Sequence, residues 1–258
     1  MSPFVGLLKK DYRIASLTIW LAGALLLLGF LLGFISSNRS GHHTFMMLTL
    51  FSSTFFLVFF MPAMMLILLR KEARTQLWLY SPRSSFSLFA SKLIVMLSYQ
   101  AIFQLIVFGY GLLTIQLFDP YILSDLHTET AVRIVIFVYF LFLFSGAAHS
   151  IIVFFYWSVY HTLYRYIAQK SLRLLVLFSI FCGYIFLESR LLNLSVTQSL
   201  IANSRISIIG DQALTNQGDW ILQFQVAQVP LFYVGYYLLV VLLLLYISCM
   251  LLTRKVEV

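Results

Sequence analysis

Five long apolar runs without any Asp, Glu, Lys or Arg constrain this chain more than any other feature. Each run is at least as long as the roughly 20 residues that an α-helix needs to cross the hydrocarbon of a bilayer. Backbone N–H and C=O groups find no water at that depth, so such runs become helices. The sequence therefore predicts five membrane spans, over residues 15–36, 44–69, 93–118, 134–160 and 231–253.

A sixth span is predicted over residues 170–190, although its apolar stretch, Leu174–Leu187, is short. It reaches membrane length if Lys170 and Arg173 extend their charged ends toward the lipid headgroups. The alternative is a buried half-span. The full span is preferred because it keeps the basic C-terminal end on the same side as the other basic residues.

Composition agrees with this interpretation, since 61% of the residues are hydrophobic and only 10% are charged. A soluble domain has about 25% charged residues, so lipid must cover much of this surface. The fold class is therefore an all-α polytopic membrane protein, with residues 1–258 forming a single transmembrane domain of six helices. The net charge of +8 does not indicate nucleic acid, because the basic residues lie at the ends of apolar runs.

The distribution of Lys and Arg predicts the orientation in the membrane. With six spans, 13 of the 17 basic residues fall on the side that holds both termini. The positive-inside rule assigns that side to the cytoplasm. We therefore expect a multi-pass protein of the cell (plasma) membrane with cytoplasmic N and C termini. Residues 1–13 are amphipathic and predict an N-terminal interfacial helix, with a disordered basic tail as the alternative.

Two regions between spans are long enough to hold a function. The cytoplasmic loop 70–92 is longer than a connector needs, and its mixture of apolar and charged residues predicts a short amphipathic docking helix that ends at Pro82. A plain charged connector is the alternative. The external segment 188–230 is unusually apolar, which predicts that it folds against the membrane or dips into it.

No catalytic, cofactor-binding or metal-binding motif is found, so we expect no enzyme activity and no cofactor in this chain. His149 and Ser145 lie four residues apart within a span, where an ionisable residue is a functional candidate. Helix packing beside the small residues 145–148 is the preferred interpretation, over an intramembrane enzyme. Gly29 and Gly33 form a GxxxG pattern, which suits either a dimer contact or packing within the chain.

The loop 70–92 contains a glutamate, a threonine three residues on, leucines, a Ser-Pro pair and a lysine at the next span, which are Glu72, Thr75, Leu77, Leu79, Ser81-Pro82 and Lys92. This pattern resembles the first cytoplasmic loop of the permease subunits of ABC-2-type transporters. Arg74 stands where many members have glycine. The resemblance implies that this is the coupling segment for a separate ATPase subunit, with contacts from Glu72, Thr75, Leu77, Trp78, Leu79 and Pro82.

The resemblance also implies a permease subunit, with export as the expected direction, that works with itself or with a paralogous permease. ATP would bind to the partner ATPase subunit, and membrane lipid would surround the spans. Three rival classes remain open at this stage. They are a membrane sensor or immunity protein that transports nothing, an intramembrane enzyme using His149, and a secondary transporter.

Overall fold

Six long helices dominate the structure, a computed structural model that describes residues 3–40, 44–75, 84–118, 128–207, 212–214, 222–224 and 228–255. Within these residues, six helices are long and apolar enough to cross a membrane. The chain is thus an all-α multi-pass membrane protein, as predicted. The six helices are α1 (Pro3–Ser40), α2 (Thr44–Thr75), α3 (Ser85–Phe118), α5 (Thr128–Tyr164), α6 (Lys170–Leu192) and α8 (Leu231–Lys255).

The helices extend beyond the predicted spans at most of their ends. Residues 70–75 and 85–92, which were expected in the loop, instead belong to α2 and α3. The apolar run marks only the part of a helix inside the hydrocarbon, and the polar residues beyond it can continue the helix until a breaker occurs. The helix expected over residues 1–13 forms the first turns of α1, without a break before the first span.

The span predicted over residues 170–190, which has the shortest apolar stretch, is a helix long enough to cross the membrane. Helix α6 covers Lys170–Leu192 and keeps its charged residues close to its two ends. The half-span alternative is therefore not what the structure shows.

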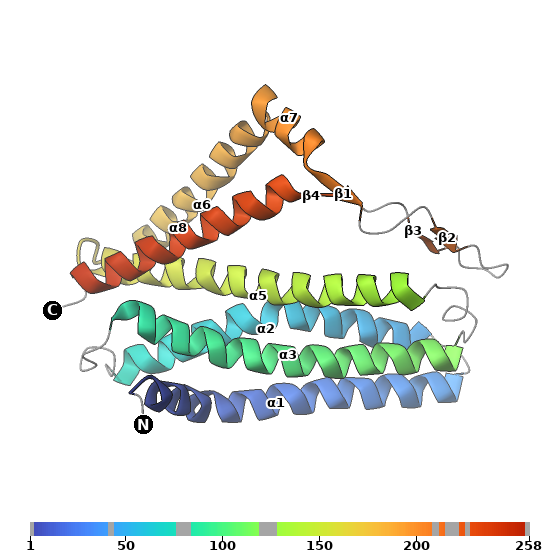
Figure 1. Cartoon of the computed structure of the whole chain (residues 1–258). Coiled ribbons are helices and arrows are strands. Elements are labelled where there is room, and N and C mark those ends of the chain that lie inside the picture. The colour runs from blue at the N-terminus through green and yellow to red at the C-terminus, as the bar shows by residue number, and fades with distance from the viewer. Residues whose placement is uncertain are drawn as a thin grey trace.

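Helices α1, α2, α3 and α5 lie side by side, as Figure 1 shows, and α2 packs against each of the other three. The centre of the bundle contains Met61 and Met65 of α2 together with Val95 and Met96 of α3, all fully buried. Met adapts to irregular gaps between helices. Helix α2 is thus the element around which the bundle is built.

Helices α6 and α8 diverge from this bundle, and the short helix α7 (Ser195–Asn203) joins α6 to the segment before α8 at the top of Figure 1. Their apolar windows are the least buried of the six spans. Helix α8 packs mainly on α5, and α6 also contacts α5. Most of the apolar side chains of α6 and α8 therefore face lipid or another chain.

The segment between α6 and α8 contains two small antiparallel ladders besides α7. Strand β1 (Arg205–Ser207) pairs with β4 (Gln228–Pro230), and β2 (Gln212–Leu214) pairs with β3 (Leu222–Phe224). Ser204 joins this segment to α8, because its carbonyl accepts a hydrogen bond from Leu231 N at 2.8 Å and its hydroxyl oxygen accepts one from Phe232 N at 3.3 Å. The described residues of this segment thus form regular secondary structure, and its position against the membrane stays a prediction.

Both chain termini lie at the same end of the bundle in Figure 1, as an even number of crossings requires. The end of α2, the start of α3 and the turn from α5 to α6 lie at this end as well. We call it the terminal end.

The two glycines of the GxxxG pattern have different surroundings. A Cβ atom at Gly33 would lie 2.7 Å from Thr49 Cγ2 on α2, whereas a Cβ at Gly29 would meet nothing within 4 Å. Gly33 therefore serves packing within the chain. Gly146 on α5 does the same, because its Cβ would lie 2.7 Å from Met61 Sδ. The close packing predicted for residues 145–148 is confirmed at this position.

This difference makes the two glycines separable by mutation. Gly33→Leu should destabilise the isolated chain by about 1–3 kcal/mol, since the larger side chain has no room against α2. Gly29→Leu should leave the thermal unfolding midpoint in detergent unchanged and weaken crosslinking between copies. An unfolding midpoint that falls equally for both variants would contradict the assignment, and unchanged crosslinking of Gly29→Leu would exclude Gly29 from a dimer contact.

Candidate coupling site at the terminal end

The predicted coupling residues fall into two groups in the structure. Glu72 and Thr75 belong to the last turns of α2. Leu77, Trp78, Leu79 and Pro82 lie outside the described residues. The structure therefore describes the two helix ends that flank the proposed docking segment, and these ends are joined by a group of buried charges.

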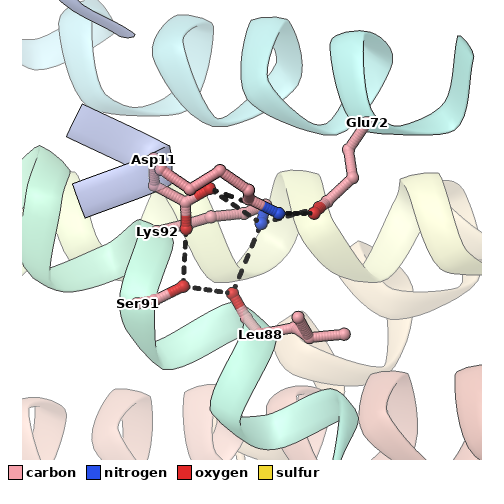
Figure 2. A network of polar contacts seen from close by, with 6 residues as sticks. Asp11, Glu72, Leu88, Ser91 and Lys92 are labelled. Carbon is pink, nitrogen blue, oxygen red and sulfur yellow. Dashed lines mark hydrogen bonds and ion pairs between the residues drawn. The ribbon is translucent and has the colours of Figure 1, made fainter. Parts of the chain in front are cut away.

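Four charged side chains from three helices meet at this place, and Figure 2 shows part of the network. Lys10 and Asp11 come from α1, Glu72 from α2 and Lys92 from α3. The exposed fractions of the Asp11, Lys92 and Glu72 side chains are 1%, 2% and 8%. With two cations and two anions, the group is electrically balanced. We call it the charge cluster.

The Lys92 ammonium has an acceptor for each of its three N–H groups. Its Nζ lies 2.6 Å from Glu72 Oε2, 3.5 Å from Asp11 Oδ1 and 3.5 Å from the Leu88 carbonyl oxygen. A buried ammonium loses its hydration, and only such close partners compensate for that loss. The charge of Lys92 is thus balanced by two carboxylates of its own chain, and a backbone carbonyl lies at the limit of hydrogen-bond distance.

The two carboxylates are satisfied in the same way. Glu72 Oε1 accepts a hydrogen bond of 2.7 Å from Lys10 Nζ, which leaves Glu72 with one lysine on each oxygen. Asp11 Oδ2 accepts a hydrogen bond of 2.6 Å from the Ser91 hydroxyl. Lys71 adds a further link between helices, because its Nζ donates to the Ile14 carbonyl at 3.1 Å. The charge cluster therefore fixes α1 to the end of α2 and to the start of α3.

Glu72 was expected to offer its charge to a basic group on a partner protein. In this structure its carboxylate is buried and bound to Lys10 and Lys92 of the same chain. Its carboxylate ties the end of α2 to α1 and α3, and a Glu72→Arg substitution would place a third cation beside two lysines. A loss of partner binding in that variant could therefore come from a destabilised fold, so it is a poor test of docking.

Sequence reasoning missed the cluster because its members are far apart in the chain. Asp11 and Ser91 are 80 residues apart, and Lys10 and Glu72 are 62 apart. The sequence did contain one indication, because Asp11 and Glu72 are acids that directly follow pairs of basic residues. An acid in such a place often has a structural partner.

Within the described ranges, the hydrogen bonds of His149 go to Ser145 of its own helix. Its Nδ1 lies 2.7 Å from the Ser145 carbonyl oxygen and 3.3 Å from the Ser145 hydroxyl. The carbonyl can only accept, so Nδ1 carries the proton and donates to it. A protonated Nδ1 cannot take a proton from the Ser145 hydroxyl, so this geometry does not form a serine nucleophile with its base.

No metal site is found in the described ranges, where no three His, Cys, Asp or Glu side chains are grouped closely enough to hold an ion. The structure therefore shows a multi-pass helical fold in which the charge cluster joins α1, the end of α2 and the start of α3. In the part of the chain that the structure describes, the ion pairs between side chains lie at the terminal end.

Comparisons with known proteins give one relative. The chain is 30% identical over 165 residues to the "Uncharacterized protein YhcE" of Bacillus subtilis (strain 168). The match covers 63% of this chain and 64% of the length of that protein. No family model and no solved structure matches.

The charge cluster leads to a prediction about stability. Lys92→Met removes the ammonium that two buried carboxylates share, and breaking a buried ion pair from one side costs about 3–5 kcal/mol. We expect a large fall in the unfolding midpoint in detergent. Lys10→Met should have a smaller effect, because the Lys10 side chain is 30% exposed. Lys9→Met, which changes an exposed neighbour, is the matched control.

A double variant distinguishes the loss of coupled charges from the loss of side-chain packing alone. Asp11→Asn combined with Lys92→Met leaves fewer unpaired charges than Lys92→Met alone. Its loss should therefore be smaller than the sum of the two single losses, as expected for side chains in one network. Strictly additive losses would show that the four charges do not act together.

Proposed function

We propose that this protein is the transmembrane permease subunit of an ABC-2-type transporter, an exporter driven by a separate ATPase subunit. The observation that carries the proposal is the segment between α2 and α3. It has the loop pattern of that family, and its flanking helix ends are clamped by the charge cluster at the terminal end. A segment that receives force from a partner needs rigid ends, and buried ion pairs across three helices supply them.

Other features support the same proposal. The described spans are held together by apolar packing, and the buried charges lie at the terminal end and not along a central path. A permease driven by ATP hydrolysis on another chain needs no titratable relay in its spans, whereas ion-driven pumps usually have one. The exposed apolar faces of α6 and α8 leave room for a second permease, either a copy or a paralogue.

The proposed orientation places the terminal end in the cytoplasm of a plasma-membrane protein, where 13 of the 17 Lys and Arg residues would lie. Cysteine substitution in a background without native cysteines tests it. A membrane-impermeant reagent added outside intact cells should label Asp125→Cys and miss Ala168→Cys and Val256→Cys. External labelling of Val256→Cys would contradict this orientation.

The docking role is tested at Trp78, whose large apolar side chain is of the type that dominates protein interfaces. Trp78→Ala should leave membrane abundance unchanged and weaken binding of the ATPase subunit by about 2 kcal/mol, roughly thirtyfold. Co-purification of the subunit and its stimulated ATP hydrolysis are the measurements. Phe86→Ala, an exposed aromatic nearby on α3, is the matched control. Full recruitment and stimulation by Trp78→Ala would refute the coupling role.

A further inference from the structure

The turn between α5 and α6 gathers positive charge at the terminal end (Figure 1). Arg165 directly follows α5, Lys170 begins α6, and Arg173 lies in the first turn of α6. The sequence has no Asp or Glu between Arg133 and Glu188. This part of the chain therefore has no acid of its own to balance its cations.

Arg173 is the most unusual member of the group, because its side chain is buried. It is only 5% exposed, and its guanidinium carbon lies 4.7 Å from the ring centroids of both Tyr160 and Tyr164. The ring faces attract a cation but carry no net charge. Arg173 Nε has no hydrogen-bond partner. The two rings therefore hold the guanidinium in place without neutralising it.

The acids described at the terminal end are already engaged. Asp11 and Glu72 are bound to Lys10 and Lys92 in the charge cluster. Among the described residues, no ion pair involves Arg165, Lys170 or Arg173. A buried charge without a counter-ion is costly, so an anion bound at the turn would stabilise the protein.

The local backbone also favours an anion. Gln169, the residue before α6, makes no side-chain hydrogen bond to the first amides of the helix. Those N–H groups point out of the positive end of the helix dipole. An arginine fork matches the oxygens of a phosphate group in charge and in geometry. The chemistry of the turn therefore suits a phosphate.

We propose that the α5–α6 turn, formed by Arg165, Lys170 and Arg173, binds the phosphate of an anionic phospholipid. Lipid is favoured as the source because Leu174 and Leu175, directly beside Arg173, are exposed on the lipid-facing surface of α6. A headgroup whose acyl chains lie along these leucines places its phosphate at the level of the turn. Basic pockets between helices on the cytoplasmic side are the usual sites of such lipids. This proposal does not depend on the transport function.

Binding is tested with the full-length protein in mixed micelles. The dissociation constant of phosphatidylglycerol is measured by native mass spectrometry, with phosphatidylcholine as the neutral comparison. Wild type should retain phosphatidylglycerol preferentially. The Arg165→Gln/Lys170→Gln double variant changes two exposed residues and should fold normally. It should weaken retention by about 25-fold, at about fivefold for each removed cation.

Arg173→Gln should weaken retention at least fivefold, and Arg173→Lys should restore part of it. Arg39→Gln, an exposed arginine in the last turn of α1, is the matched control and should leave the dissociation constant unchanged. If Arg173→Gln fails to fold, the double variant at the exposed positions decides the question.

Three kinds of result would overturn the proposal. The first is a lack of dependence on the lipid charge or on the basic residues. It would be seen as equal retention of phosphatidylglycerol and phosphatidylcholine by the wild type, or as an unchanged dissociation constant of phosphatidylglycerol in the double variant. The second is displacement of phosphatidylglycerol by millimolar inorganic phosphate, which would make the turn a site for free phosphate. The third is loss of ATPase-subunit recruitment in the double variant with lipid retention intact, which would make it a protein-docking surface.

Discussion

Neutralisation of a buried ammonium by two carboxylates from other helices is the interaction on which the terminal end depends. Asp11 Oδ1 and Glu72 Oε2 lie 3.5 Å and 2.6 Å from Lys92 Nζ and compensate for the hydration that the ammonium loses on burial. Apolar surfaces in a membrane can slide past one another, because lipid solvates them as well as a neighbouring helix does. Ion pairs at defined distances cannot, so the register of α1, α2 and α3 is fixed here.

Farther along the bundle, glycines position the helices by letting them approach closely. Gly33 lets α1 approach Thr49 of α2, and Gly146 lets α5 approach Met61 of the same helix. Since α2 participates in both contacts and in the charge cluster, it connects every part of the four-helix bundle. Pro62 lies inside α2. Neighbouring helices make such a break in the hydrogen-bond ladder tolerable within a membrane.

The sequence was sufficient to predict the six spans, because the bilayer sets a length that any crossing helix must meet. The sequence did not predict where each helix ends, because residues such as Arg70–Thr75 are helical without being apolar. Charge asymmetry predicts an orientation but no pairing, so the partners of Asp11 and Lys92 became visible only in three dimensions. Gly33 packs within the chain, which is one of the two roles that the GxxxG pattern allowed, and a dimer contact at Gly29 stays a prediction. The neighbour of each glycine depends on packing that no local pattern encodes. The docking segment 76–83 stays a prediction from its resemblance.

The long sequence separation within the charge cluster has a consequence for biosynthesis. Asp11 is made 80 residues before the serine that binds it, so at 5–20 residues per second a nascent chain waits roughly 4–16 s for that partner. During this interval the acid stays near the headgroups, where water can solvate it. The first helix can therefore settle fully only after the third has entered the bilayer, which makes residues 3–118 one unit of assembly that α5, α6 and α8 then join.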